Sequence, residues 1–89
     1  MVTTETLKKS LATLSEVFVA DGASSYKESF DEFMREHEFG LALHSVCDYL
    51  ISEGVGQITL DRIILIQELH SAMQLQDSCV SELESARAR

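Results

Sequence analysis

Three histidines and two cysteines have the most versatile chemistry in this chain, and their spacing limits what that chemistry could be. His37 and His44 lie seven residues apart and His70 stands in a separate segment, so none of them forms the His-x-x-x-His pair that presents two zinc ligands on one helix face. Cys47 and Cys79 form no Cys-x-x-Cys motif. We therefore expect no metal and no other cofactor, with His37 at a helix end and His70 hydrogen-bonded at the edge of the core.

The cysteines and hydroxyl groups show no catalytic arrangement. Cys47 falls in an apolar stripe, which favours a small buried hydrophobic side chain, while a disulfide stays open from the sequence alone. No serine lies in a Gly-x-Ser-x-Gly elbow, and no glycine-rich loop could hold a phosphate. Asp77-Ser78-Cys79 is similar to the Asp-Ser-Leu attachment site of acyl carrier proteins, but there a long central helix follows the serine and here only a short last one does. We expect that the protein is not an enzyme.

Length and charge narrow the choice of partner. With 89 residues, 45% of them hydrophobic, the chain is expected to be one domain of residues 1–89 with a modest core. The formal net charge of −8 opposes binding to nucleic acid or to an anionic membrane surface and favours a basic protein. The segment MVTTETLKKSL has no apolar signal core, and no run reaches the ~18 apolar residues of a membrane span. We therefore expect a cytoplasmic protein.

Hydrophobic periodicity predicts the helices that must position these groups. Asp77 is expected to cap a short last helix, and no alternation of apolar and polar residues indicates a strand. The prediction is an all-α bundle of four helices plus a short fifth. The four longer helices are expected over residues 3 or 4 to 20, 26–36, 39–52 and 60–73.

Local signals mark where several of these helices begin and end. Ser25 and Glu28 match a capping box at the start of the second helix, and Thr59 is the expected N-cap of the fourth. A break at His37 and Glu38 separates the second helix from the third. The alternative is that the two form one kinked helix.

The fourth helix is apolar on more than one side. Ile63, Ile66 and Leu69 share one face, whereas Leu60 and Ile64 lie roughly opposite. Such a helix is either central in its bundle or covers a partner. We expect Leu60 and Ile64 to be core residues beneath the fifth helix. The alternative is that they form a self-association face.

Carboxylates gather on the second helix and beyond it. Glu28, Glu32 and Glu36 stack at positions i, i+4 and i+8, opposite Phe30 and Phe33. Between residues 28 and 53 there are seven acidic residues and one basic residue. A solvated outer face explains any one of these carboxylates, but a cluster of one sign also steers a cationic partner and raises its association rate. The three glutamates are therefore candidate partner contacts.

The third helix carries a second candidate surface. Leu41, His44 and Asp48 lie opposite its core stripe, with Ile51 beside them and Tyr49 on the flank. Either both faces of this helix are buried, which we favour, or these residues form a partly apolar patch rimmed by acid, as in many protein interfaces.

Part of the chain resembles a known family. The runs HEFGLAL at 37–43, CDYL at 47–50 and QIT at 57–59 resemble the MafI-like immunity proteins of bacterial polymorphic toxin systems, and the match spans residues 30–73, about half of the chain. The resemblance implies a small cytosolic antidote that is encoded beside a toxin and neutralises it by binding. The polar positions that match the family pattern are Glu38, Asp48 and Tyr49.

Charge and resemblance together lead to one hypothesis. We expect an immunity protein that binds and blocks a cognate toxin domain, foremost a nuclease, because a nuclease needs a basic cleft for phosphate and an acidic protein can plug it. The alternative is a helical adaptor or homodimer that uses the spare apolar face of the fourth helix.

Overall fold

A computed structural model describes residues 3–19 and 23–88, and within these ranges the chain is helical and forms no strand. This confirms the predicted all-α architecture, with four longer helices and a shorter last one. Two short 3-10 turns, η1 (Ser15–Val17) and η3 (Val55–Gln57), follow the first and third helices. The α-helices are α1 (Thr4–Leu14), α2 (Ser24–Arg35), α3 (Phe39–Ser52), α4 (Leu60–Ala72) and α5 (Cys79–Ala88).

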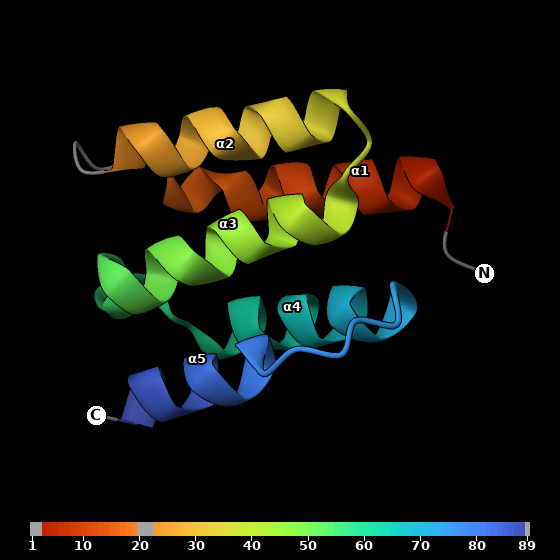
Figure 1. Cartoon of the computed structure of the whole chain (residues 1–89). Helices are drawn as coiled ribbons and strands as arrows, with labels where there is room; N and C mark the ends of the chain where they lie inside the picture. The colour runs from red at the N-terminus through yellow and green to blue at the C-terminus, as the bar shows by residue number, and fades with distance from the viewer. Residues whose placement is uncertain (1–2, 20–22, 89) are drawn as a thin grey trace.

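The third helix is the centre of the bundle. Figure 1 shows α3 crossing the molecule between α1 and α2 on one side and α4 and α5 on the other, and α3 packs against all four. A helix with neighbours on both sides buries most of its surface, but Leu41 and Asp48 remain exposed, so the expectation that both faces of this helix are buried holds only in part. Its buried side chains include Ala42, Leu43, Val46, Cys47, Tyr49 and Leu50.

Two predicted helix ends differ from the structure. The α-helix ends at Leu14, and the chain goes on as the 3-10 turn η1. This tighter turn still carries Val17 and Phe18 into the core, so their spacing from Leu14 resembles that of an α-helix. The remaining residue of that prediction, Ala20, lies outside the described residues. The predicted capping box at Ser25 is wrong, since α2 already begins at Ser24 without a side-chain cap.

The expected cap at Thr59 is present, and Thr3 caps α1 in the same way. Thr3 Oγ1 accepts a hydrogen bond from the backbone N–H of Thr6 at 3.2 Å, and Thr59 Oγ1 accepts one from the N–H of Arg62 at 3.2 Å. Each threonine satisfies one of the N–H groups that the first turn of a helix leaves without a partner.

The predicted break between the second and third helices is confirmed. His37 has a φ of +58°, and its N–H donates to the carbonyl of Met34 at 3.2 Å while the N–H of Glu38 donates to that of Phe33 at 2.8 Å. This pair of bonds is a Schellman motif, which closes α2 and turns the chain into α3. The His37 ring stacks on Phe39, with 5.4 Å between ring centroids. His37 therefore lies at a helix end, as expected.

Tyr49 belongs to an aromatic cluster in the core and not to the surface. Its side chain is 1% exposed, and its ring centroid lies 5.4 Å from that of Phe18 and 5.5 Å from that of Tyr26. Gln57 Nε2 donates to its hydroxyl at 3.3 Å, so the buried phenol oxygen is satisfied. The prediction of Tyr49 as a partner contact is wrong, because α2 and η1 cover the flank on which it lies.

Leu60 and Ile64 are not core residues. They are 56% and 44% exposed, one helical turn apart on the outer side of α4. The inner side of α4 carries Ile63, Ile66 and Leu69, which are buried. Because α5 packs on α3, α4 and η3 without covering this outer side, the expectation that the fifth helix would bury both residues is wrong.

Candidate functional site

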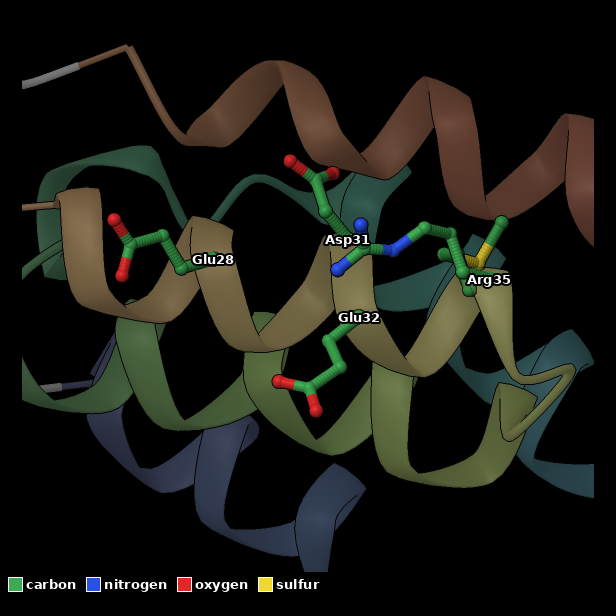
Figure 2. A pocket seen from close by; sticks show the side chains of 5 residues that line it. Glu28, Asp31, Glu32 and Arg35 are labelled. Carbon is green, nitrogen blue, oxygen red and sulfur yellow. The ribbon is translucent and has the colours of Figure 1, made fainter.

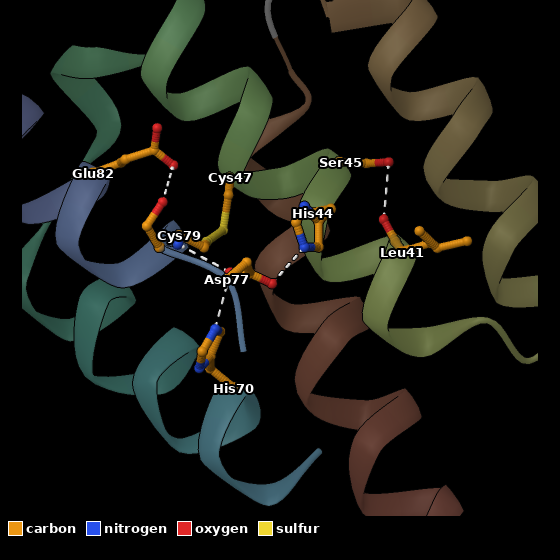
Figure 3. Close-up of a disulfide and its surroundings, with 9 residues drawn as sticks. Leu41, His44, Ser45, Cys47, His70, Asp77, Cys79 and Glu82 are labelled. Atoms are coloured by element: carbon orange, nitrogen blue, oxygen red, sulfur yellow. Dashed lines mark hydrogen bonds and ion pairs between the residues drawn. A yellow bond between two sulfur atoms is a disulfide. The ribbon is translucent and has the colours of Figure 1, made fainter. Parts of the chain in front are cut away.

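A single carboxylate joins two histidines where α3, α4 and α5 meet. Asp77 Oδ2 accepts a hydrogen bond from His44 Nε2 at 2.6 Å, and Asp77 Oδ1 accepts one from His70 Nε2 at 3.0 Å. The backbone N–H of Cys79 donates to the same Oδ1 at 3.0 Å. Figure 3 shows Asp77 between the two rings. We call His44, Asp77 and His70 the Asp77 cluster.

The turn after α4 places Asp77 in this position. Gln74 has a φ of +55°, and the N–H of Leu75 donates to the carbonyl of His70 at 3.1 Å, which forms a second Schellman motif. The Leu75 side chain then lies against Gly40 of α3, where an added Cβ would be 3.2 Å from Leu75 Cδ2. The chain is thereby turned back along α3, so that Asp77 reaches both histidines and caps α5 as predicted.

Cys47 and Cys79 form a disulfide beside the Asp77 cluster. The sulfur atoms are 2.07 Å apart and the Cα atoms 6.4 Å apart, and both residues are buried. Burial of Cys47 was expected, but not its covalent partner. The bond closes a loop of about 33 residues, which in the chain-entropy model stabilises the fold by roughly 3–4 kcal/mol. The disulfide fixes the first residue of α5 to the middle of α3.

The surroundings of Asp77 set its affinity for a proton. Partial burial alone would raise the pKa of this carboxyl, but the hydrogen bonds from the Cys79 N–H, His70 and His44 and the charge of His44 outweigh it and lower the pKa from 3.8 to about 2. Asp77 is therefore ionised throughout the physiological range. The cluster ties α3 and α4 to the start of α5 through one carboxylate, so its geometry supports a structural clamp.

Acid should weaken the protein through this clamp. The folded-state pKa of Asp77 lies below the unfolded value, so its contribution is complete above about pH 4 and is lost as pH falls towards 2. Because the side chain is 28% exposed, we expect roughly 1–2 kcal/mol. Urea unfolding at pH 5 and at pH 2.5 should show the Asp77→Asn variant less stable than wild type at pH 5, with a clearly smaller difference at pH 2.5. An equal difference at both pH values would contradict this reading.

The predicted acidic residues form an exposed face on α2 and the turn that follows. Glu28, Glu32, Glu36 and Glu38 are all exposed. Figure 2 shows Glu28 and Glu32 around a hollow on α2 that Asp31, Met34 and Arg35 also line. Asp31 belongs to this face although the sequence reasoning did not select it, and its carboxylate pairs with Lys27 Nζ at 2.8 Å. We define the acidic face as Glu28, Asp31, Glu32, Glu36 and Glu38.

The predicted surface of α3 is a narrow strip. Leu41 is 46% exposed, Asp48 is exposed, and His44 and Ile51 are partly covered. These four residues follow one another along the helix, as their spacing predicted. The His44 ring is engaged with Asp77, so it is less free to bind a partner than the sequence suggested. The helix α2, which carries most of the acidic face, packs against α3.

Metal-binding and membrane-spanning features are not found in the described parts of the chain. Across residues 3–19 and 23–88, no group of three or more His, Cys, Asp or Glu side chains is placed to hold a metal ion. In the same ranges no helix combines the length and the apolar character that crossing a bilayer requires. Comparison with known protein families, with curated proteins and with solved structures gave no match.

Proposed function

We propose that this protein is an immunity protein that binds a basic toxin domain through the acidic face and thereby blocks it. The observation that carries the proposal is the row of exposed glutamates at positions 28 and 32 of α2 and at position 36, which ends this helix. Like charges at i and i+4 disfavour the helix that bears them by roughly 0.2–0.5 kcal/mol per pair. A partner that supplies the missing cations turns this internal repulsion into attraction. The resemblance to the MafI-like family supports the same conclusion.

The chemistry of the surface favours a nuclease as the target. A nuclease holds the phosphates of its substrate in a basic cleft, and a helix with carboxylates spaced one turn apart presents negative charge at comparable intervals. The apolar side chain of Leu41 on the neighbouring helix adds a contact that could be desolvated at the centre of such an interface. We therefore expect the toxin to be neutralised by occlusion and without any reaction.

Reversal of three carboxylates tests this proposal. Replacing Glu32 and Glu36 of the acidic face, together with Asp48 of α3, by Lys should leave helicity unchanged, because all three are exposed. It should lower the affinity for the toxin domain at least tenfold, chiefly by slowing association. Raising the salt concentration should weaken wild-type binding more than that of the variant, because mobile ions screen charges over ~8 Å at physiological ionic strength. Surface plasmon resonance at several salt concentrations measures both effects.

A matched variant separates the acidic face from net charge. Replacing Glu5, Glu16 and Glu68 by Lys changes the net charge by the same amount but alters exposed residues of α1, η1 and α4. This control should bind the toxin domain nearly as well as wild type. If both triple variants bind equally, at every salt concentration, then the acidic face is solvated surface and the proposed interface is wrong.

A homodimer is the second candidate, and the exposure of Leu60 and Ile64 favours it. A net charge of −8 opposes self-association, so we expect the 9.9 kDa chain to sediment as a monomer. Because Ile64 is exposed, Ile64→Glu should retain the far-ultraviolet spectrum of wild type. A wild-type dimer that Ile64→Glu converts to a monomer would support the adaptor function in place of the immunity function.

The cellular location is part of the proposal. Action against a nuclease inside the producing cell places the protein in the cytoplasm, as the sequence predicted. The Cys47–Cys79 disulfide weighs against this location, because disulfides persist mainly in oxidising compartments. Alkylation of free thiols in freshly lysed cells measures the oxidation state of the two cysteines. Fully oxidised cysteines in cells would favour a target outside the cytoplasm.

A further inference from the structure

The last helix has little to hold it in place by itself. α5 has ten residues, and a helix of this length is marginal in water without tertiary contacts. It buries Cys79, Leu83 and Ala86, spaced so that they form one stripe. Two of these side chains are small, so Leu83 is the one large apolar side chain that α5 buries fully.

The strongest attachments of α5 lie at its first turn. The disulfide joins Cys79 to Cys47 of α3, and Asp77, two residues before the disulfide, holds His44 of α3 and His70 of α4. Beyond this end, α5 has an exposed side-chain bond to α4, from Gln67 Nε2 to a Glu84 carboxylate oxygen at 2.9 Å. Loss of the attachments at residues 77 and 79 would leave a short helix held by a narrow apolar stripe.

The part of the core formed by α1, α2 and α3 lies away from α5, whereas α4 packs on α5 as well as on α1 and α3. The helices α1, α2, α3 and α4 contribute their own buried residues, and the Schellman motif after α2 and the caps at Thr3 and Thr59 lie away from α5. Figure 1 shows α1 and α2 on the side of α3 opposite to α5. The acidic face therefore lies on a part of the bundle that α5 does not hold together.

We propose that α5 is a reducible latch: a dithiol reductant that opens the Cys47–Cys79 bond releases α5 from α3 and α4, while α1, α2 and α3 stay folded. A thiolate of the reductant attacks one cysteine sulfur and displaces the other as a thiolate, which takes up a proton. The second thiol of the reductant resolves the mixed disulfide, so Cys47 and Cys79 gain two electrons and two protons and the reductant becomes a disulfide. Release uncovers the apolar surface of α3 and α4 under Leu83.

The latch makes exposure of this surface depend on the redox state of the surroundings. In oxidising surroundings α5 stays closed, and in reducing surroundings a hydrophobic face opens on the side away from the acidic face. The proposal does not rest on the proposed partner, because binding through α2 should be the same in both states. If the oxidised protein does not bind the toxin domain, the proposed function is wrong and the proposal about α5 is unaffected.

Hydrogen exchange followed by mass spectrometry tests the latch on the full chain. With dithiothreitol as the reductant, amides of residues 79–88 should exchange at least tenfold faster than in the oxidised protein, while those of α2 and α3 change little. The Cys47→Ser/Cys79→Ser double variant should behave like the reduced protein and should not respond to dithiothreitol. The Asp77→Asn variant with its disulfide intact should keep residues 79–88 protected.

Three results would overturn the proposal. Unchanged protection of residues 79–88 after reduction would show that the apolar stripe alone holds α5. Loss of protection in all helices together would show that the disulfide stabilises the whole bundle as one unit. Release of α5 in Asp77→Asn with the disulfide intact would assign the attachment to the Asp77 cluster instead. If the double cysteine variant does not fold, reduction of wild type still distinguishes the first two outcomes, and the Asp77→Asn variant tests the third.

Discussion

Replacement of Val46 by Asp is expected to unfold the protein. Val46 is 0% exposed and lies in the middle of α3, the helix that packs against the four others. A carboxylate at this position would lose its water without gaining a partner, which costs about 4 kcal/mol or more. A chain of this size has a total stability of roughly 5–13 kcal/mol, so the substitution removes a large part of it.

The same substitution on the other side of α3 provides the control. Leu41 is 46% exposed, so an aspartate there stays hydrated and Leu41→Asp should cost about 1 kcal/mol or less. Far-ultraviolet circular dichroism and urea unfolding measure both variants. A folded Val46→Asp protein with an unfolding midpoint near that of wild type would show that α3 is not the centre of the core.

Replacement of Gly54 by Ala is expected to destabilise the protein by about 1–3 kcal/mol. Gly54 follows α3, and a Cβ at this residue would lie 2.8 Å from Tyr49 Cε2 and 3.4 Å from the Cα of Leu50. The Tyr49 ring cannot move away easily, because Phe18 and Tyr26 pack against it. The cost is therefore overpacking in the aromatic cluster. Urea unfolding at neutral pH measures it.

Gly56, two residues further on, is the matched control. An added Cβ there meets no atom within 4 Å, so Gly56→Ala should be close to neutral or slightly stabilising through the unfolded state. The two variants differ in their surroundings and not in their chemistry. Equal stability of Gly54→Ala and Gly56→Ala would mean that the Tyr49 ring can yield, and that the aromatic cluster is looser than its geometry indicates.

Local signals in the sequence were sufficient for much of the fold. The bounds of α3, the break at His37 and the cap at Thr59 follow from short-range backbone and capping geometry, which depends on neighbouring residues. The end of α1 was predicted incorrectly because a 3-10 turn carries Val17 to the core at a spacing close to that of an α-helix. Leu60 was placed in the core because apolar character alone does not say which side of a helix has a neighbour.

For the candidate surfaces too, features of a single helix were predictable and contacts between helices were not. The exposed glutamates of α2 were predicted correctly as an outer face, because charge opposite an apolar stripe is a property of one helix. Tyr49 was misassigned because its burial depends on how α2 and η1 pack against α3. The Asp77 cluster joins residues from three parts of the chain, and two signals pointed towards it: the capping role of Asp77 and the expected hydrogen bond of His70.

The bond between Cys47 and Cys79 closes the chain between them into a covalent ring, and α4 is part of this ring. A protease that cuts once in the connection before or after α4 would therefore produce no smaller molecule, because both pieces stay joined through the sulfur atoms. A nicked molecule of this kind keeps its mass apart from one added water. Because the cut lies in a connection and not in a helix, the nicked protein can keep all of its helices. A single backbone break within the ring therefore does not separate the protein into two molecules.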